Sequence, residues 1–169
     1  MRWFPFFILA YLALGLQAGL ARAIEWNSAS PDFVLIAVVF LSLSAPRDAA
    51  LLACFILGLL HDFTSHGTLG LLGFSYGLAS VFVTAIQQAV NRNHIAVHFF
   101  LTVFVGFIGA IVLTLHGWLR PPAPGVHLPV LPLFYSAIYS AILAMLIVPL
   151  LQKISGVFHF QTSRGRMYD

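Results

Sequence analysis

Long apolar runs separated by short polar breaks make up most of the chain, and this pattern predicts six helices. A helix needs about 20 apolar residues to cross the hydrocarbon core of a bilayer, which is ~30 Å thick. The first run and the last three approach or reach that length, whereas the second and third have only about a dozen apolar residues, or ~18 Å of helix. The predicted helices cover residues 3–21, 32–44, 48–60, 69–88, 95–118 and 130–152.

The second and third runs form a predicted helical hairpin. They are joined by the sequence Ser-Ala-Pro-Arg-Asp, in which Pro46 prevents one continuous helix and Asp48 can cap the next one. Two arrangements fit such short helices: a pair of tilted spans in a locally thinned bilayer, or a re-entrant pair. Both return the chain to the side of the membrane from which it came.

Composition decides the fold class. Of the 169 residues, 60% are hydrophobic and only 8% are charged, and the mean hydropathy is +0.97. A soluble domain carries about 25% charged residues. Backbone groups in hydrocarbon must be satisfied within each segment, so we predict an all-α polytopic membrane helix bundle, with about six transmembrane helices in a single domain over residues 1–169.

The ends of the chain carry the topology signals. Arg2 and the sequence Ala21-Arg22-Ala23 resemble the flanks of a signal peptide, but the apolar run between them is long enough to span a bilayer, so we expect an uncleaved first transmembrane helix. A cytoplasmic N-terminus places six basic residues inside and two outside, which predicts that both termini are cytoplasmic. The inside residues are Arg2, Arg47, Arg92, Lys153, Arg164 and Arg166, and the outside residues are Arg22 and Arg120.

Two sequence motifs suggest enzyme chemistry, and each has a plainer interpretation. Gly73-Phe-Ser75-Tyr-Gly77 matches the G-x-S-x-G pattern of serine hydrolases, which requires a strand-turn-helix setting. The glycines lie four residues apart inside a predicted membrane helix, where small residues let two helices approach closely. Gly15 and Gly19 in the first helix repeat this spacing, so helix packing is the favoured interpretation of both pairs.

The second motif is the cluster of His61, Asp62 and His66, which lacks the H-E-x-x-H spacing of zinc proteases. We interpret these residues as the polar end of a helix at the membrane interface. Asp62 lies near a helix C-terminus, where the helix dipole disfavours an anion, and carboxylates at membrane depth are costly. We therefore expect Asp62 to have a partner: Arg22, Arg120 or a donor on a neighbouring helix.

Other polar residues have structural explanations. Asp32 follows a proline and is the predicted N-cap of the second helix. His98 and His116 are expected to be satisfied interior histidines rather than ligands. The lone Cys54 has apolar neighbours, which indicates a small buried side chain and excludes an intramolecular disulfide.

Four short stretches between positions 31 and 77 are distinctive: Pro31-Asp32, Pro46-Arg47, the run from Gly58 to Asp62, and the following Gly67 and Gly70. Together with the six apolar segments, they make the chain resemble the MreD family of bacterial rod shape-determining proteins. The resemblance in architecture covers nearly the whole chain. The resemblance implies a non-catalytic scaffold subunit of the cell-elongation complex in the bacterial inner membrane. It also implies a fold similar to the S components of energy-coupling-factor transporters.

The same resemblance implies partners and sites. The partners are the bitopic protein MreC, and through it or directly MreB and the RodA–transpeptidase synthase of peptidoglycan, together with the lipid bilayer. No catalytic residue, metal, cofactor or nucleic acid is predicted. The candidate partner or pocket residues are Asp32, Gly58, Asp62, Gly67, Gly70, Gly73 and Gly77, and the basic cytoplasmic tail contributes Lys153, Arg164 and Arg166.

Two alternatives stay open. The first is a substrate-binding membrane subunit of a small-molecule importer, which requires a cavity lined by polar or aromatic groups such as Tyr76, Gln87, His98 or Tyr139. The second is an intramembrane hydrolase built on Ser75 or on the His61 cluster. A co-purifying ligand favours the first, and labelling by a serine-reactive probe or bound zinc favours the second.

Overall fold

The computed structural model describes residues 3–21, 23–25, 29–65, 69–86, 95–119 and 130–158. In these ranges the regular structure is helical, as the apolar pattern predicted. The described helices are α1 (Trp3–Gly19), α2 (Phe33–Ser44), α3 (Arg47–Thr64), α4 (Leu71–Ile86), α5 (Ile95–Leu119) and α6 (Val130–Phe158).

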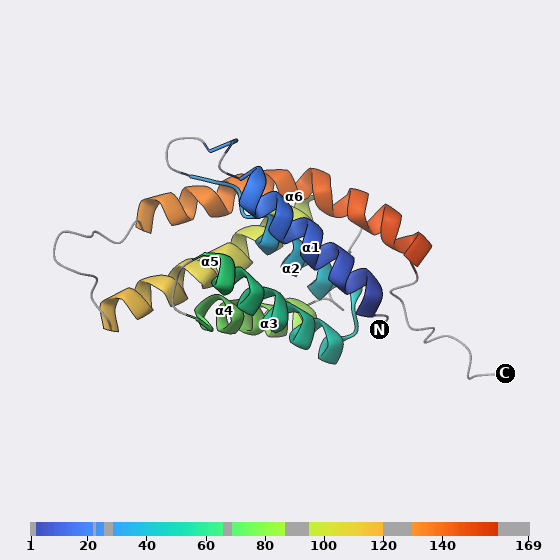
Figure 1. Ribbon diagram of the computed structural model, residues 1–169, viewed down its shortest axis with the longest axis horizontal. Coiled ribbons are helices and arrows are strands. Elements are labelled where there is room, and N and C mark those ends of the chain that lie inside the picture. Colours follow the sequence, from blue (N-terminus) through green and yellow to red (C-terminus); the bar gives the residue numbers. More distant parts are fainter. Residues whose placement is uncertain are drawn as a thin grey trace.

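Successive helices run in opposite directions along one bundle (Figure 1). The ends of α1, α3 and α5 therefore lie beside the starts of α2, α4 and α6, on the left in Figure 1. This end of the bundle, here called the junction end, contains the candidate residues Asp32, Asp62 and Gly70. The start of α1 and the end of α6 lie at the opposite end.

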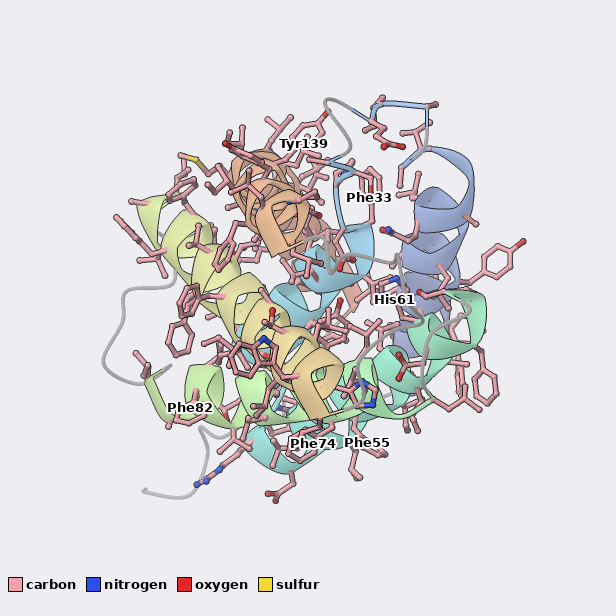
Figure 2. The ribbon with its side chains drawn as sticks, turned by 90° about the vertical axis from the view of Figure 1, so that its left-hand side faces the viewer. Phe33, Phe55, His61, Phe74, Phe82 and Tyr139 are labelled. Carbon is pink, nitrogen blue, oxygen red and sulfur yellow. The ribbon has the colours of Figure 1, made fainter. Side chains whose placement is uncertain are left out.

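Helix α2 is the centre of the bundle. Viewed from the junction end, it is enclosed by the other helices (Figure 2), and every residue from Phe33 to Leu43 is buried. A helix that is apolar on all sides is stable only where protein or lipid covers every face. Because neighbouring helices cover α2, this helix of 12 residues is stable inside the bundle although it is too short to cross a bilayer by itself.

The outer helices expose many large apolar side chains. Tyr11 on α1, Phe100 on α5 and Leu146 on α6 are each more than two-thirds exposed, a distribution that suits contact with lipid. Among the described residues, two helices are long and apolar enough to cross a membrane, over residues Ile95–Leu119 and Leu131–Lys153, and α1, α2 and α4 are shorter apolar helices. The helical class and the two long apolar helices agree with a helical membrane protein.

The predicted bounds of the third helix were wrong. Helix α3 has 18 residues and continues to Thr64 instead of ending at residue 60. The polar residues His61 and Asp62 do not end the helix because both are buried on its inner face. Asp48 is also not the N-cap: Pro46 occupies that position and Asp48 lies in the first turn, where the helix dipole favours an acidic side chain.

Helices α3 and α4 touch through their backbones. A Cβ atom added at Gly58 on α3 would lie 2.6 Å from the Cα of Gly73 and 2.7 Å from the carbonyl oxygen of Leu72 on α4. The close packing predicted for Gly73 is therefore correct. The same prediction for α1 was wrong within the described chain, because a Cβ at Gly15 or Gly19 would meet nothing within 4 Å.

Candidate functional site

Asp62 joins α3 to α4 at the junction end. Its carboxylate accepts hydrogen bonds from the backbone N–H groups of Gly70 (2.8 Å), Leu72 (3.1 Å) and Gly73 (3.3 Å). These N–H groups belong to the start of α4, where a helix has donors without partners in its own backbone. Asp62 is therefore a cap supplied to α4 by the preceding helix, and the dipole of α4 stabilises its charge.

The glycine turn before α4 makes this capping possible. Gly70 has a φ of +92°, a backbone conformation that residues other than glycine adopt only with strain. Its N–H points at Asp62 in this conformation. The expected partner of Asp62 is thus a set of donors at a neighbouring helix, and the alternatives Arg22 and Arg120 lie outside the described residues.

Asp32 caps α2 from its own chain position, as predicted. Its Oδ1 accepts a hydrogen bond from the N–H of Leu35 (2.9 Å), and its Oδ2 accepts one from the hydroxyl of Tyr76 (2.7 Å). The backbone N–H of Asp32 donates to Oγ of Ser140 on α6 (2.7 Å). One residue therefore connects the start of α2 to both α4 and α6.

Tyr76 bridges Asp32 and His61. Its single hydroxyl proton is donated to Asp32, so its oxygen accepts from Nδ1 of His61, 3.4 Å away. The two rings also stack, with centroids 6.2 Å apart and planes 14° from parallel. His61 is only 7% exposed and points between the helices (Figure 2), so its interpretation as an interfacial helix end was wrong.

Hydroxyl groups on α6 hold the connection between α1 and α2. Ser136 donates to the carbonyl oxygen of Ser30, Tyr139 donates to that of Ile24 (3.2 Å), and Ser140 receives the N–H of Asp32. Sequence analysis missed this role of Ser136 and Ser140. Their signal was two hydroxyls four residues apart in an otherwise apolar helix, which a single sequence does not distinguish from small packing residues.

Replacing Ser140 with alanine is expected to lower the melting temperature of the detergent-solubilised protein by about 2–5 °C. The change removes the acceptor of the Asp32 N–H, and an unpaired buried donor costs about 1 kcal/mol or more. The matched control is Ser75→Ala, since the Ser75 hydroxyl donates only to the Leu71 carbonyl within its own helix. Equal melting temperatures for the two variants would contradict the anchoring role.

The G-x-S-x-G stretch is helical throughout. Ser75 is fully buried in the second turn of α4, with helical residues on both sides. A Cβ added at Gly73 would lie 3.0 Å from the side chain of Leu59 on α3, and one added at Gly77 would lie 3.5 Å from that of Phe55. The favoured interpretation, glycines that allow helix packing, is therefore correct for Gly73, whereas a Cβ at Gly77 would make only an ordinary contact.

The remaining candidates are dispersed. Lys153 is exposed near the end of α6, the helix end opposite the junction end. Five other candidates lie outside the described residues: Gly67, Arg164, Arg166, His66 and Gln87. No group of three potential metal ligands occurs among the described residues. His98 is 1% exposed and its Nδ1 has no hydrogen-bond partner in the part of the chain that the structure describes, so the expectation of a satisfied interior histidine was wrong at that atom.

A small crevice opens beside Asp32, between α5 and α6. Its volume is about 50 Å³, whereas pockets for organic ligands hold ~300–1,000 Å³. Within the described part of the chain, Tyr76 lines this crevice but His98 and Tyr139 do not. The crevice is too small for the vitamin-sized ligand that an importer subunit would bind.

Comparison with known proteins gives one result. Neither the curated proteins nor the solved structures include a significant match to the chain. The family model described as rod shape-determining protein MreD matches residues 1–155. This match spans nearly the whole chain, from α1 into the last turn of α6, and confirms the family resemblance. The chain therefore belongs to the MreD family of rod shape-determining membrane proteins.

Proposed function

We propose that this MreD-family chain is a non-catalytic scaffold that links MreC to the peptidoglycan-synthesis machinery of the rod complex. The observation that carries this proposal is that the buried polar groups at the junction end bond to one another and to the backbone of neighbouring helices. Asp62 accepts from three backbone N–H groups, and Tyr76 and Asp32 bond to each other. These groups fix helices against one another, which is the chemistry of a rigid scaffold rather than of a reacting centre.

The membrane arrangement is part of the same proposal. All six helices lie within the bilayer of the inner membrane, with both termini cytoplasmic and an arrangement similar to the S components of energy-coupling-factor transporters. The exposed apolar surface of the outer helices supports this proposal, and the excess of basic residues in the predicted cytoplasmic segments supports the orientation. The tail with Lys153, Arg164 and Arg166 then meets anionic lipid headgroups.

The deciding experiment is purification of the tagged chain from its native membrane in mild detergent, followed by mass spectrometry of proteins and small molecules. The expected result is a stoichiometric bitopic partner with a periplasmic domain, namely MreC, together with MreB or the RodA–transpeptidase synthase. A bound small ligand and an ATPase module in place of these proteins would contradict the scaffold and identify an importer subunit.

We also propose that the corner from Gly58 to Gly77 presents the outer face of α3 and α4 to a protein partner. Phe74 in this corner and Phe55, one turn before Gly58 on α3, point outward (Figure 2). Both line an apolar groove of about 360 Å³ on this face. Replacing Asp62 or Gly70 is expected to weaken complex assembly, because the corner holds the two helices in register. Assembly that is unchanged in both variants would contradict this role.

A non-catalytic chain predicts a specific result for Ser75. Cells whose only copy of this gene carries Ser75→Ala are expected to grow as rods at the wild-type rate, because the hydroxyl serves only its own helix. Cell shape by microscopy is the measurement. Round cells with normal amounts of the variant protein would instead indicate a reacting serine.

A further inference from the structure

We propose that the crevice between α5 and α6 receives one lysine or arginine side chain from a membrane segment of a partner protein, with Asp32 as its counter-charge. The proposal rests on the scaffold function above and assigns a specific contact to it. It differs from the α3–α4 corner in place and in chemistry.

The shape of the crevice follows from small residues on the two helices. Gly106 and Ala137 hold α5 and α6 together, since a Cβ added at Gly106 would lie 2.6 Å from that of Ala137. One turn further along α5, a Cβ at Gly109 would meet nothing within 4 Å. Open space thus follows this contact one turn further along α5, and Asp32 lines it together with Ser136.

The charge of Asp32 is less compensated than that of Asp62. Asp62 is 2% exposed and receives three backbone N–H groups, whereas the carboxylate of Asp32 receives one backbone N–H and one hydroxyl. A carboxylate has about four lone-pair positions, so Asp32 can accept further hydrogen bonds from the crevice. Among the described residues, no cationic side chain forms an ion pair with Asp32, and carboxylates at membrane depth pair with cations or line polar cavities.

The lining selects the kind of cation. Hard metal ions bind about six or more oxygen atoms, but the crevice offers the carboxylate, two serines and Tyr76 in an otherwise aliphatic wall. The aliphatic part is formed by Leu35, Leu72, Ala110, Leu113, Leu133 and Ala137. Lysine and arginine combine an apolar stem with a charged head, and about 50 Å³ admits one such head group. A small crevice with one carboxylate and aliphatic walls therefore fits a lysine or arginine side chain better than a free metal ion.

The test co-expresses MreC with the tagged chain and compares three variants with the wild type. Gly109→Leu adds a side chain at a position that lines the crevice and where a Cβ would meet nothing within 4 Å. Asp32→Asn removes the charge but keeps an oxygen that can cap Leu35. Gly15→Leu is the matched control, because a side chain at Gly15 also enters open space. The melting temperature of each variant, purified without MreC, shows whether it is folded. If Asp32→Asn is not folded, Gly109→Leu decides the test.

We expect Gly109→Leu and Asp32→Asn to retain about tenfold less MreC, or less still, and Gly15→Leu to retain the wild-type amount. Asp32→Lys combined with a Lys or Arg→Asp exchange in the membrane segment of MreC is expected to restore the complex. Wild-type amounts of MreC with both crevice variants would overturn the crevice proposal and leave the scaffold function intact. A wild-type chain that retains no MreC would contradict the scaffold function and the crevice together.

Two further results would assign the crevice to another cation. If sodium or potassium, compared with choline, raises the melting temperature of the wild type but not of Asp32→Asn, the occupant is a free ion. If Arg120→Gln lowers the melting temperature of the isolated chain as much as Asp32→Asn does, the counter-charge comes from this chain. Either result overturns the assignment to a partner.

Discussion

Replacing Asp62 with alanine is expected to lower the free energy of unfolding by about 3 kcal/mol. The variant leaves three backbone N–H groups at the start of α4 without their acceptor. Loss of an ordinary cap costs ~0.5–2 kcal/mol, and each buried unpaired donor costs ~1–3 kcal/mol. Because this carboxylate also ties α3 to α4, the loss exceeds that of a cap within one helix.

The measurement is thermal unfolding of the purified variant in the wild-type detergent, where a loss of this size corresponds to a decrease on the order of 10 °C. Asp62→Asn keeps one acceptor oxygen and is expected to lose less than Asp62→Ala. The control is Asp48→Ala, since Asp48 is exposed and no side-chain hydrogen bond caps the start of its helix. Equal effects of the Asp62→Ala and Asp48→Ala changes would show that the capping geometry does not contribute to stability.

A single methyl group at Gly58 is expected to be as damaging as the loss of the Asp62 carboxylate. The Cβ of Gly58→Ala would lie 2.6–2.8 Å from backbone atoms of α4, which cannot move aside as a side chain can. Overpacking typically costs ~1–3 kcal/mol. Because helix α4 must shift as a whole here, we expect the free energy of unfolding to decrease by ~3 kcal/mol. This value already includes the ~1 kcal/mol that alanine gains over glycine in helix propensity.

The matched control for this substitution is Gly77→Ala, at another glycine of the same helix pair. Its Cβ would meet Phe55 at 3.5 Å, an ordinary contact, so the gain in helix propensity should raise stability by ~0.5–1 kcal/mol. Thermal unfolding of both variants measures the difference. Two variants that shift the melting temperature in the same direction would contradict the backbone contact between α3 and α4.

The apolar pattern determined the class and the order of the elements. Six helices occur where six apolar runs predicted them, because apolar side chains and the need to satisfy backbone hydrogen bonds leave few other structures for such runs. Pro46 marked the break between α2 and α3, and Asp32 marked the start of α2, since each acts on backbone groups close to it in sequence. These local effects depend only on neighbours in sequence and are therefore readable from it.

The role of Asp62 required the tertiary structure. The sequence showed that an anion at this place needs a partner, but its partners are the N–H groups of Gly70, Leu72 and Gly73. Main-chain donors look the same at every position of a sequence, so only the fold shows which of them converge. The end of α3 was misplaced for the same reason: His61 and Asp62 are polar, yet the bundle buries them and the helix continues.

The glycines divide in the same way. The same spacing predicts close helix packing at Gly15–Gly19 and at Gly73–Gly77. Of these four glycines, only Gly73 takes part in the backbone contact with Gly58, and the glycines of α1 border open space. The chain by itself determined which segments are helical and which residues cap or break them, because those are local preferences. Packing decided which helix becomes the buried centre, which carboxylate is closed by backbone donors and which one faces a crevice. These features depend on contacts between residues that are distant in sequence, such as Asp32 and Ser140, which are 108 positions apart.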